Sequence, residues 1–218
     1  MTTSRFTGLL LVAPALLLIG VLFIMPLGYS IVDAFTVSDN GQAEISLANF
    51  LLAFELYADD ILFTIIIIGI SAFLVGLGAI CIGGYIVLGN NRFLVNVLRA
   101  LYRWPLFIPF IVAAQCMRTF LAKNGLMNGV LVEIGLLTPL ETVGFLDWRG
   151  IIITFVWKQL PFATLLVAGA MAALDRSTID AARDMGASKP RILAQIVVPQ
   201  VMPTLVVALV LYIVTMMS

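Results

Sequence analysis

One charged segment between two hydrophobic stretches has the residue types and spacing to bind a partner protein. It reads Asp180-Ala181-Ala182, then Gly186 after three residues, then Ile196-x-Val198-Pro199 after nine more. Ser177 and Asp180 match the S-x-x-D form of a capping box, with Ser177 as the N-cap of a short helix. Gly186 suits the left-handed residue that ends such a helix, and Ser188 can cap a second helix with Pro190 in its first turn. The pattern predicts a helix, a glycine turn and a second helix.

The first of these helices has a small apolar face and charges that can pair. Its apolar residues recur at steps of three: Ile179, Ala182 and Met185. Arg176 and Arg183 both have the spacing for an ion pair with Asp180, each worth about 0.2–0.5 kcal/mol. Such a helix can lie on a bilayer surface or insert into a cleft of a soluble protein. The narrow apolar face gives little membrane affinity, and the two adjacent alanines suit close approach, so the sequence favours the protein cleft.

Other kinds of chemistry find little support in the sequence. The chain has no histidine, which removes the commonest general base and the usual zinc ligand. Cys81 and Cys116 lie in apolar stretches and are interpreted as packing thiols. The phosphate-binding pattern G-x4-G-K-[ST] is absent. We therefore predict no catalytic residue, no metal site and no cofactor bound by this chain.

The composition places the chain in a membrane. Hydrophobic residues make up 62% and charged residues 11%, whereas about 25% of the residues of a soluble domain are charged. Charge-free runs of 27 residues (6–32) and 31 residues (61–91) both exceed the length needed to span the bilayer. The first run is longer than the apolar part of a signal peptide, so we expect a retained span. The sequence predicts an all-α integral membrane protein.

We expect five transmembrane helices in one domain covering residues 1–218, at about 9–32, 61–88, 104–121, 151–173 and 196–217. Lysine and arginine accumulate in cytoplasmic loops of membrane proteins. A cytoplasmic N-terminus puts eight basic residues inside: Arg5, Arg92, Arg99, Arg103, Arg176, Arg183, Lys189 and Arg191. Three lie outside, and the first outer loop, residues 33–60, holds six acidic residues and no basic one. This asymmetry predicts a cytoplasmic loop at 175–195.

Polar side chains inside the spans are candidates for lining a pathway. Lys158 is either a functional charge or a lysine that extends to the outer interface. Gln115 and Gln159 can line a pathway or hydrogen-bond between helices. Small residues recur along the second span, which suits close helix packing or, alternatively, sliding during a transport cycle: Gly69, Ala72, Gly76, Ala79 and Gly83.

The charged segment resembles the EAA loop of permeases from type I, binding-protein-dependent ABC importers. That loop has Glu-Ala-Ala, three residues, Gly, nine residues and Ile-x-Leu-Pro. Here Asp180 stands for Glu and Val198 for Leu, and the shorter acid has less reach for an ion pair. The likeness extends to 157–162 and to Asn124-Gly125-Leu126-Met127-Asn128, and so covers most of residues 60–218.

The resemblance implies a multi-pass permease subunit in the bacterial cytoplasmic (inner) membrane, whose loop docks onto a cytoplasmic ATPase dimer as a coupling helix. The residues implied in coupling are Asp180, Ala181, Ala182, Gly186, Ile196 and Pro199. ATP would be used by the ATPase alone. The other implied partners are a second permease subunit, identical or different, an extracytoplasmic solute-binding protein and the lipid bilayer, with no nucleic acid. Permeases of this type usually have a further helix, so we expect the final helix of the fold to be missing from residues 1–218; the alternative is an intact protein with five spans.

The implied solute is small and polar. The run 181–188 resembles polyamine permeases and the run 157–162 resembles sugar permeases, so a polyamine-like solute ranks first and a sugar second. The alternative function is a membrane scaffold that binds partners without transport. A scaffold would use the small-residue stripe and the charged segment, but it leaves the full EAA spacing unexplained.

Overall fold

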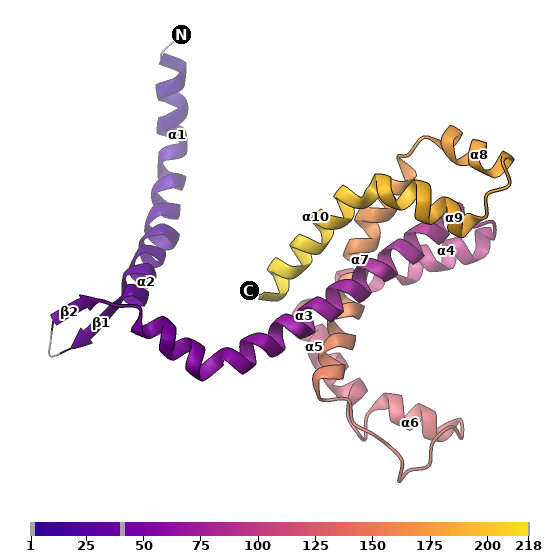
Figure 1. Cartoon of the computed structure of the whole chain (residues 1–218), viewed down its shortest axis with the longest axis horizontal. Coiled ribbons are helices and arrows are strands. Elements are labelled where there is room, and N and C mark those ends of the chain that lie inside the picture. The colour runs from indigo at the N-terminus through magenta and orange to yellow at the C-terminus, as the bar shows by residue number, and fades with distance from the viewer. Residues whose placement is uncertain (1–2, 40–41, 218) are drawn as a thin grey trace. The chain divides into compact units, whose positions relative to one another are not determined.

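The computed structural model describes residues 3–39 and 42–217, and its regular structure is helical apart from one small hairpin (Figure 1). The chain divides into two compact units, Met1–Phe63 and Thr64–Ser218, which are described separately. Within the described residues, four helical stretches are long and apolar enough to cross a membrane, and a fifth is added if one bent pair counts as a span. The predicted all-α membrane fold is therefore confirmed.

The helical stretch at the first predicted span extends beyond 9–32, and its part that is apolar enough to cross a membrane is Leu11–Phe35. The stretch consists of three helical segments in succession: α1 (Thr3–Ile19), η1 (Gly20–Ile24) and α2 (Met25–Phe35). The π-helical turn η1 lies directly before Pro26, and the Met25 N–H donates to the Gly20 carbonyl. Proline has no N–H and its ring crowds the preceding turn, so a wider turn accommodates it without ending the helix.

Part of the predicted outer loop forms a hairpin that the sequence analysis missed. β1 (Thr36–Asp39) pairs antiparallel with β2 (Gln42–Ile45). The Asn49 amide donates to the Thr36 carbonyl at 3.0 Å, and the rings of Phe35 and Phe50 lie 5.0 Å apart. These contacts fix the hairpin to the helices on either side of it.

Helix α3 (Ala48–Leu88) begins thirteen residues before the predicted span at 61–88. Ser46 Oγ accepts a hydrogen bond from the Ala48 N–H at 3.1 Å and so caps the helix. The acidic residues Glu55, Asp59 and Asp60 interrupt the apolar run, but they do not end the helix. The prediction of a loop up to Asp60 was wrong because the edge of an apolar run was taken as the end of a helix.

The third predicted span, 104–121, is broken. Helix α4 (Arg92–Leu101) and the 3₁₀ helix η2 (Trp104–Phe107) precede the break, and α5 (Phe110–Leu121) follows it. The two parts are bent by 109°. Ile108 has extended backbone angles (φ −89°, ψ 123°), because the Pro109 ring disfavours a helical residue before it.

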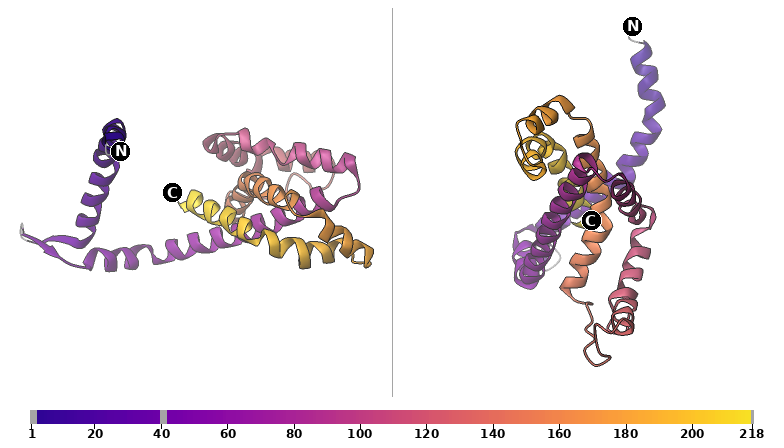
Figure 2. Two further views of the ribbon diagram at one scale, coloured as in Figure 1. Left: turned by 90° about the horizontal axis from the view of Figure 1, so that it is seen from above. Right: turned by 90° about the vertical axis from the view of Figure 1, so that its right-hand side faces the viewer.

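The remaining helices are α6 (Leu126–Glu133), α7 (Trp148–Ala172), α8 (Arg176–Asp184), α9 (Lys189–Ile192) and α10 (Val198–Met217). The span predicted at 151–173 corresponds closely to α7. The last predicted span, 196–217, begins earlier, at Lys189, because α9, the π turn η3 (Leu193–Val197) and α10 follow one another without a break. Within the second unit α8 and α6 lie near opposite ends of α7 (Figures 1 and 2).

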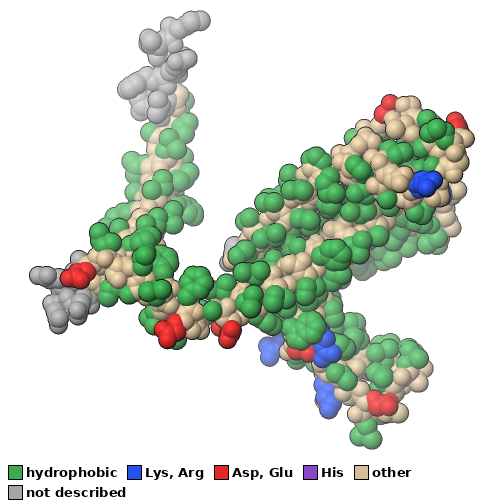
Figure 3. All heavy atoms as spheres, viewed as in Figure 1, with side chains coloured by type: hydrophobic (Ala, Val, Ile, Leu, Met, Phe, Trp, Pro, Cys, Tyr) green, Lys and Arg blue, Asp and Glu red, His purple; other side chains and the backbone are tan. Residues whose placement is uncertain are grey.

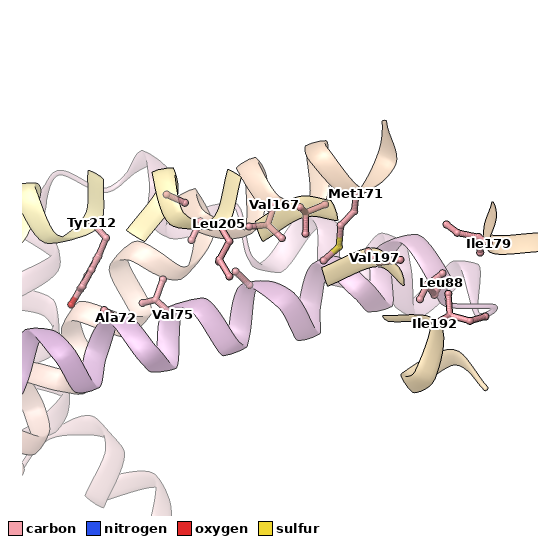
Figure 4. Packing of buried hydrophobic residues seen from close by; sticks show 14 of the residues in the cluster. Ala72, Val75, Leu88, Val167, Met171, Ile179, Ile192, Val197, Leu205 and Tyr212 are labelled. Atoms are coloured by element: carbon pink, nitrogen blue, oxygen red, sulfur yellow. The ribbon is translucent and has the colours of Figure 1, made fainter. Parts of the chain in front are cut away.

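One hydrophobic core joins α3, α7 and α10 and extends into α8 and α9 (Figure 4). A Cβ at Gly76 would lie 3.5 Å from Leu209 of α10, and one at Gly83 would lie 3.5 Å from the Ala168 backbone of α7. Four members of the small-residue stripe, Ala72, Gly76, Ala79 and Gly83, are therefore buried within the chain, whereas Gly69 is exposed. The buried residues of the hydrophobic core are Ile68, Ala72, Val75, Ala79, Leu88, Ala163, Val167, Met171, Ile179, Ala182, Ile192, Val197, Val201, Leu205, Ala208 and Tyr212.

Candidate functional site

Helix α8 starts two residues earlier than the capping-box prediction. Its N-cap is Asp175, whose carboxylate accepts the Ser177 N–H at 2.9 Å and the Ser177 hydroxyl at 2.7 Å. The prediction of Ser177 as N-cap was wrong, because Asp175 offers the stronger acceptor at a position that Ser177 can itself donate to. The hydroxyl and the N–H of Ser177 hold the pKa of Asp175 below its usual range. Asp180 is thereby left free of a capping role.

Asp180 instead forms one of its two predicted ion pairs. Its carboxylate lies 3.2 Å from the Arg183 guanidinium, and 61% of the Asp180 side chain is exposed. The spacing to Arg176 was also compatible with pairing, but among the described residues only the Arg183 pair forms. An exposed pair of this kind contributes little to stability, so Asp180 remains available to a partner.

The turn at Gly186 is the part of the prediction that the structure confirms most directly. Gly186 has φ +79°, in the left-handed region. Its N–H donates to the Arg183 carbonyl at 2.8 Å, and the Ala187 N–H donates to the Ala182 carbonyl at 3.0 Å. These two bonds form a Schellman motif, which satisfies the last carbonyls of α8. The chain then enters α9 after Ser188, which takes the N-cap position without a side-chain capping bond, and Pro190 lies in the first turn.

The predicted apolar face of α8 points into the protein, not toward a partner. Ile179 is 6% exposed and Ala182 is 4% exposed, and both belong to the core that holds α3, α7 and α10. Ile192 of α9 is fully buried in the same core. Met185 is the exception, at 83% exposed. The prediction that the apolar face of α8 inserts into a cleft of a partner is therefore corrected. Two of its three residues, Ile179 and Ala182, pack in the core of this chain instead.

The surface left for a partner is the outer face of α8, defined here as Asp180, Ala181, Asp184 and Met185, all of which are exposed. Beside it is a hollow of about 280 Å³ between α8, the Gly186 turn and the start of the last span. Figure 3 shows a few charged side chains at the end of the unit that carries α8 and α9 and another group near α5 and α6, whereas hydrophobic side chains cover the visible face of α10.

Ile196 and Pro199 lie where α9 passes into α10. Ile196 is half-buried beside the core, and Pro199 is exposed in the first turn of α10. The π turn η3 comes directly before it, and the Val198 N–H donates to the Leu193 carbonyl. This wider turn accommodates the proline, as η1 does before Pro26, so the second helix of the segment runs unbroken into the last span.

Lys158 is held by two backbone carbonyls far away in the sequence. Its Nζ donates to the carbonyl of Pro105 at 2.6 Å and to that of Ile108 at 2.7 Å. Both carbonyls lie at the break between α4 and α5, where the Pro105 carbonyl also accepts the Ile108 N–H at 3.3 Å. This geometry tests neither of the two roles predicted for Lys158, a pathway charge or extension to the interface. Its ammonium group bridges α7 to the break.

The two glutamines do not share this site. Gln115, exposed on α5, lines a hollow of about 570 Å³ together with Ile108 and Trp157. Gln159 is half-buried on α7 and does not line that hollow. The structure thus separates the three polar residues that were grouped as pathway candidates, and their role in transport stays a prediction.

Replacing Lys158 by methionine is expected to destabilise the folded chain by about 1–3 kcal/mol, because the carbonyls of Pro105 and Ile108 lose a cationic donor and Pro105 keeps only the Ile108 N–H. Thermal unfolding in detergent measures the effect. Lys158→Arg keeps a cationic donor and should retain part of the stability, and Gln159→Met is the control at the neighbouring position. A Lys158→Met protein with unchanged stability but no solute uptake would instead favour a role in the pathway.

The Asn124–Asn128 segment has a structural role that spacing alone did not reveal. Asn128 is 2% exposed, and its Nδ2 lies within hydrogen-bond distance of the carbonyls of Lys123 (3.0 Å) and Val143 (2.8 Å). A Cβ on Gly125 would collide with the carbonyl oxygens of the end of α5. The signal in the sequence was Asn128, a polar residue on the inner side of the short helix α6. Its hydrogen bonds join the connection before α6 to the connection after it.

In the described part of the chain no group of three or more Cys, Asp or Glu side chains is placed to hold a metal ion. Cys81 and Cys116 are both free thiols. The segment of α8, the Gly186 turn and α9 has an exposed outer surface, and its inner side is anchored in the helical core.

Comparison with known proteins bears directly on this arrangement. The family described as "Binding-protein-dependent transport system inner membrane component" matches residues 75–218. The spermidine/putrescine transport system permease protein PotB of Escherichia coli (strain K12) is 26% identical over 153 residues, covering 68% of this chain and 55% of PotB. The trehalose/maltose transport system permease protein MalF of Thermococcus litoralis is 33% identical over 119 residues, covering 53% of this chain and 40% of MalF. The chain thus spans about half or less of the length of these relatives.

Solved structures show the same fold. A bacterial ABC transporter involved in the import of the acidic polysaccharide alginate contains a chain with a TM-score of 0.78 and 22% identity, covering 98% of this chain and 74% of that one. The bacterial alginate ABC transporter in complex with an alginate pentasaccharide-bound periplasmic protein gives a TM-score of 0.76, 21% identity and 96% coverage of this chain. These structures show the fold. Because the family match covers residues 75–218, more than half of the chain, the chain belongs to the inner-membrane permeases of type I, binding-protein-dependent ABC importers.

Proposed function

We propose that this permease moves a small polar solute across the membrane and couples that movement to a cytoplasmic ATPase through residues 177–199. The observation that carries the proposal is that one side of α8 packs in the core of the spans while the other side is exposed. Its inner residues Ile179 and Ala182 belong to the core of α3, α7 and α10, while its outer face is exposed. A force applied to the outer face is transmitted to the spans, because close-packed cores resist local deformation.

The proposal places the N-terminus and α8 on the cytoplasmic side, as the distribution of basic residues favours. Ser188, between α8 and α9, and Leu140, between α6 and α7, are both exposed. Helices α8 and α6 lie near opposite ends of α7 (Figure 1). In a background with Cys81 and Cys116 replaced by alanine, a membrane-impermeant thiol reagent added to intact cells should label Leu140→Cys and leave Ser188→Cys unlabelled until the cells are permeabilised. The reverse pattern would overturn the proposed orientation.

ATP hydrolysis is assigned to the partner ATPase, since this chain lacks the phosphate-binding loop. The other proposed partners are a second permease subunit, identical or different, and a solute-binding protein outside the membrane. The alginate transporter complex, which contains a periplasmic protein, supports that last assignment by fold similarity.

For the solute we propose a polyamine-like compound first and a sugar second. The relatives named above include permeases for spermidine/putrescine and for trehalose/maltose, and the alginate importer has the same fold. The broad range of these solutes fits a system in which a separate binding protein supplies much of the selectivity.

The function is tested by purifying the tagged chain from its own membranes in mild detergent and identifying what accompanies it. An ATPase subunit and a second permease are expected, and the cells should take up labelled putrescine or a labelled disaccharide in an ATP-dependent way that is lost when the chain is deleted. A folded chain recovered without an ATPase, with uptake unaffected by the deletion, would favour the membrane scaffold.

A further inference from the structure

A hollow of about 270 Å³ lies between α3, α4, α7 and α8, away from the outer face of α8. Three arginines line it: Arg99, Arg103 and Arg176. No acidic residue is among its lining residues, and in the described part of the chain none of the three arginines forms an ion pair. Three like charges around one hollow repel one another, and an anion placed between them would relieve that repulsion.

One of the guanidinium groups is already oriented. The Arg103 Nε donates to the Tyr102 hydroxyl at 3.3 Å, and the Arg103 guanidinium carbon lies 5.6 Å from the centre of the Tyr102 ring. Tyr102 itself is buried against Ile86 and Val95. This contact uses one donor of Arg103 and leaves its two terminal nitrogens available, which is the geometry that binds phosphate in a bidentate manner.

The other wall of the hollow is apolar and belongs to a span. It consists of Leu165, Ala168, Gly169 and Ala172 on α7. In the segment of the chain that carries Arg99 and Arg103, Leu101 is 60% exposed, Trp104 is 74% exposed and Phe107 is 84% exposed. Exposed tryptophan and aliphatic side chains beside arginines are typical of helices at the boundary between head groups and acyl chains.

We propose that this hollow binds the phosphate of an acidic phospholipid from the cytoplasmic leaflet. The three arginines would contact the phosphate, and the small residues of α7 would contact the glycerol and the first acyl carbons. Basic pockets between spans on the cytoplasmic side bind anionic head groups in this way. An acidic segment of the ATPase would also match the charge, but the apolar α7 wall and the exposed Trp104 favour the lipid. The inference uses the proposed orientation and is independent of coupling by α8.

The test uses the full chain in lipid nanodiscs made of phosphatidylcholine, with or without phosphatidylglycerol. Wild type is expected to be stabilised against heat by phosphatidylglycerol and to retain it in native mass spectrometry. Arg99→Gln should weaken that retention about tenfold, because one charge-assisted hydrogen bond is lost, and the triple variant Arg99→Gln/Arg103→Gln/Arg176→Gln should lose it. Arg92→Gln is the matched control, since Arg92 is on the same helix α4 and does not line the hollow.

Arg99→Gln alone keeps the test valid if the triple variant fails to fold, because Arg99 is exposed and outside the Tyr102 contact. Equal retention of phosphatidylglycerol by wild type, Arg92→Gln and Arg99→Gln would overturn the proposal. So would stabilisation by inorganic phosphate equal to that by the lipid, which would indicate a site for a free anion. Loss of the ATPase subunit from Arg99→Gln with lipid retention unchanged would identify the ATPase as the occupant.

Discussion

A Gly186→Pro protein is expected to insert into the membrane but to lose ATPase activity stimulated by the solute-loaded binding protein. Gly186 has φ +79° and its N–H donates to the Arg183 carbonyl. Proline fixes φ near −65° and has no N–H, so both features of the turn are lost at a cost of about 3 kcal/mol or more. The angle between α8 and α9 is then expected to change, so that the outer face of α8 no longer fits the proposed docking surface of the ATPase.

Gly186→Ala gives the graded version of this prediction. A Cβ at Gly186 would meet no other atom within 4 Å, so the cost comes only from the left-handed backbone, about 1–2 kcal/mol. Gly129→Ala is the matched control, because Gly129 is an exposed helical glycine with open space for a Cβ and an ordinary φ. Activity should fall in the order wild type, Gly186→Ala, Gly186→Pro, with Gly129→Ala close to wild type. Normal stimulated ATPase activity in Gly186→Pro would count against coupling through this turn.

Two adjacent alanines on α8 are expected to respond in opposite ways to a bulky side chain. Ala181 is exposed, whereas Ala182 is 4% exposed within the core. Ala181→Trp should leave thermal stability unchanged and prevent the ATPase from co-purifying, because the indole ring would block the docking surface. Ala182→Trp should lower the stability by about 1–3 kcal/mol, since the core has no space for the ring.

The pair separates docking from folding, because both variants carry the same side chain one residue apart. Ala53→Trp, at an exposed position on the first part of α3, controls for a general effect of an added tryptophan. Co-purification of the ATPase with Ala181→Trp at wild-type yield would show that the outer face of α8 is not the docking surface. Equal loss of stability in Ala181→Trp and Ala182→Trp would contradict the assignment of inner and outer faces.

Features that depend on neighbouring residues were predictable. The turn at Gly186 followed from a glycine directly after a short helix, and Pro190 marked the first turn of the next one. The starting point of α8 was missed because Asp175 and Ser177 compete for the same cap, and a pattern match does not decide between them. The hairpin at 36–45 was missed for a related reason, since two strands of four residues give little periodicity.

What the sequence by itself determined is the class of protein and the local form of its charged segment. Long charge-free runs require a membrane, because nothing else covers so much apolar surface. The spacing from Asp180 to Pro199 indicated the helix, the turn and the family, since each of these is set by residues a few positions apart. The structure adds that this segment shares a core with three spans.

Only the tertiary structure decided which way the side chains of that segment face and what holds the broken span. Ile179 and Ala182 face inward because α3, α7 and α10 meet beneath α8. The spacing of apolar residues within α8 predicts an apolar face, but it does not indicate what that face packs against. Lys158 reaches the carbonyls of Pro105 and Ile108, about fifty residues earlier, because the break at Pro109 brings them next to α7. Both depend on contacts between segments far apart in the chain, and such contacts leave no mark in the local pattern of hydrophobic and polar residues.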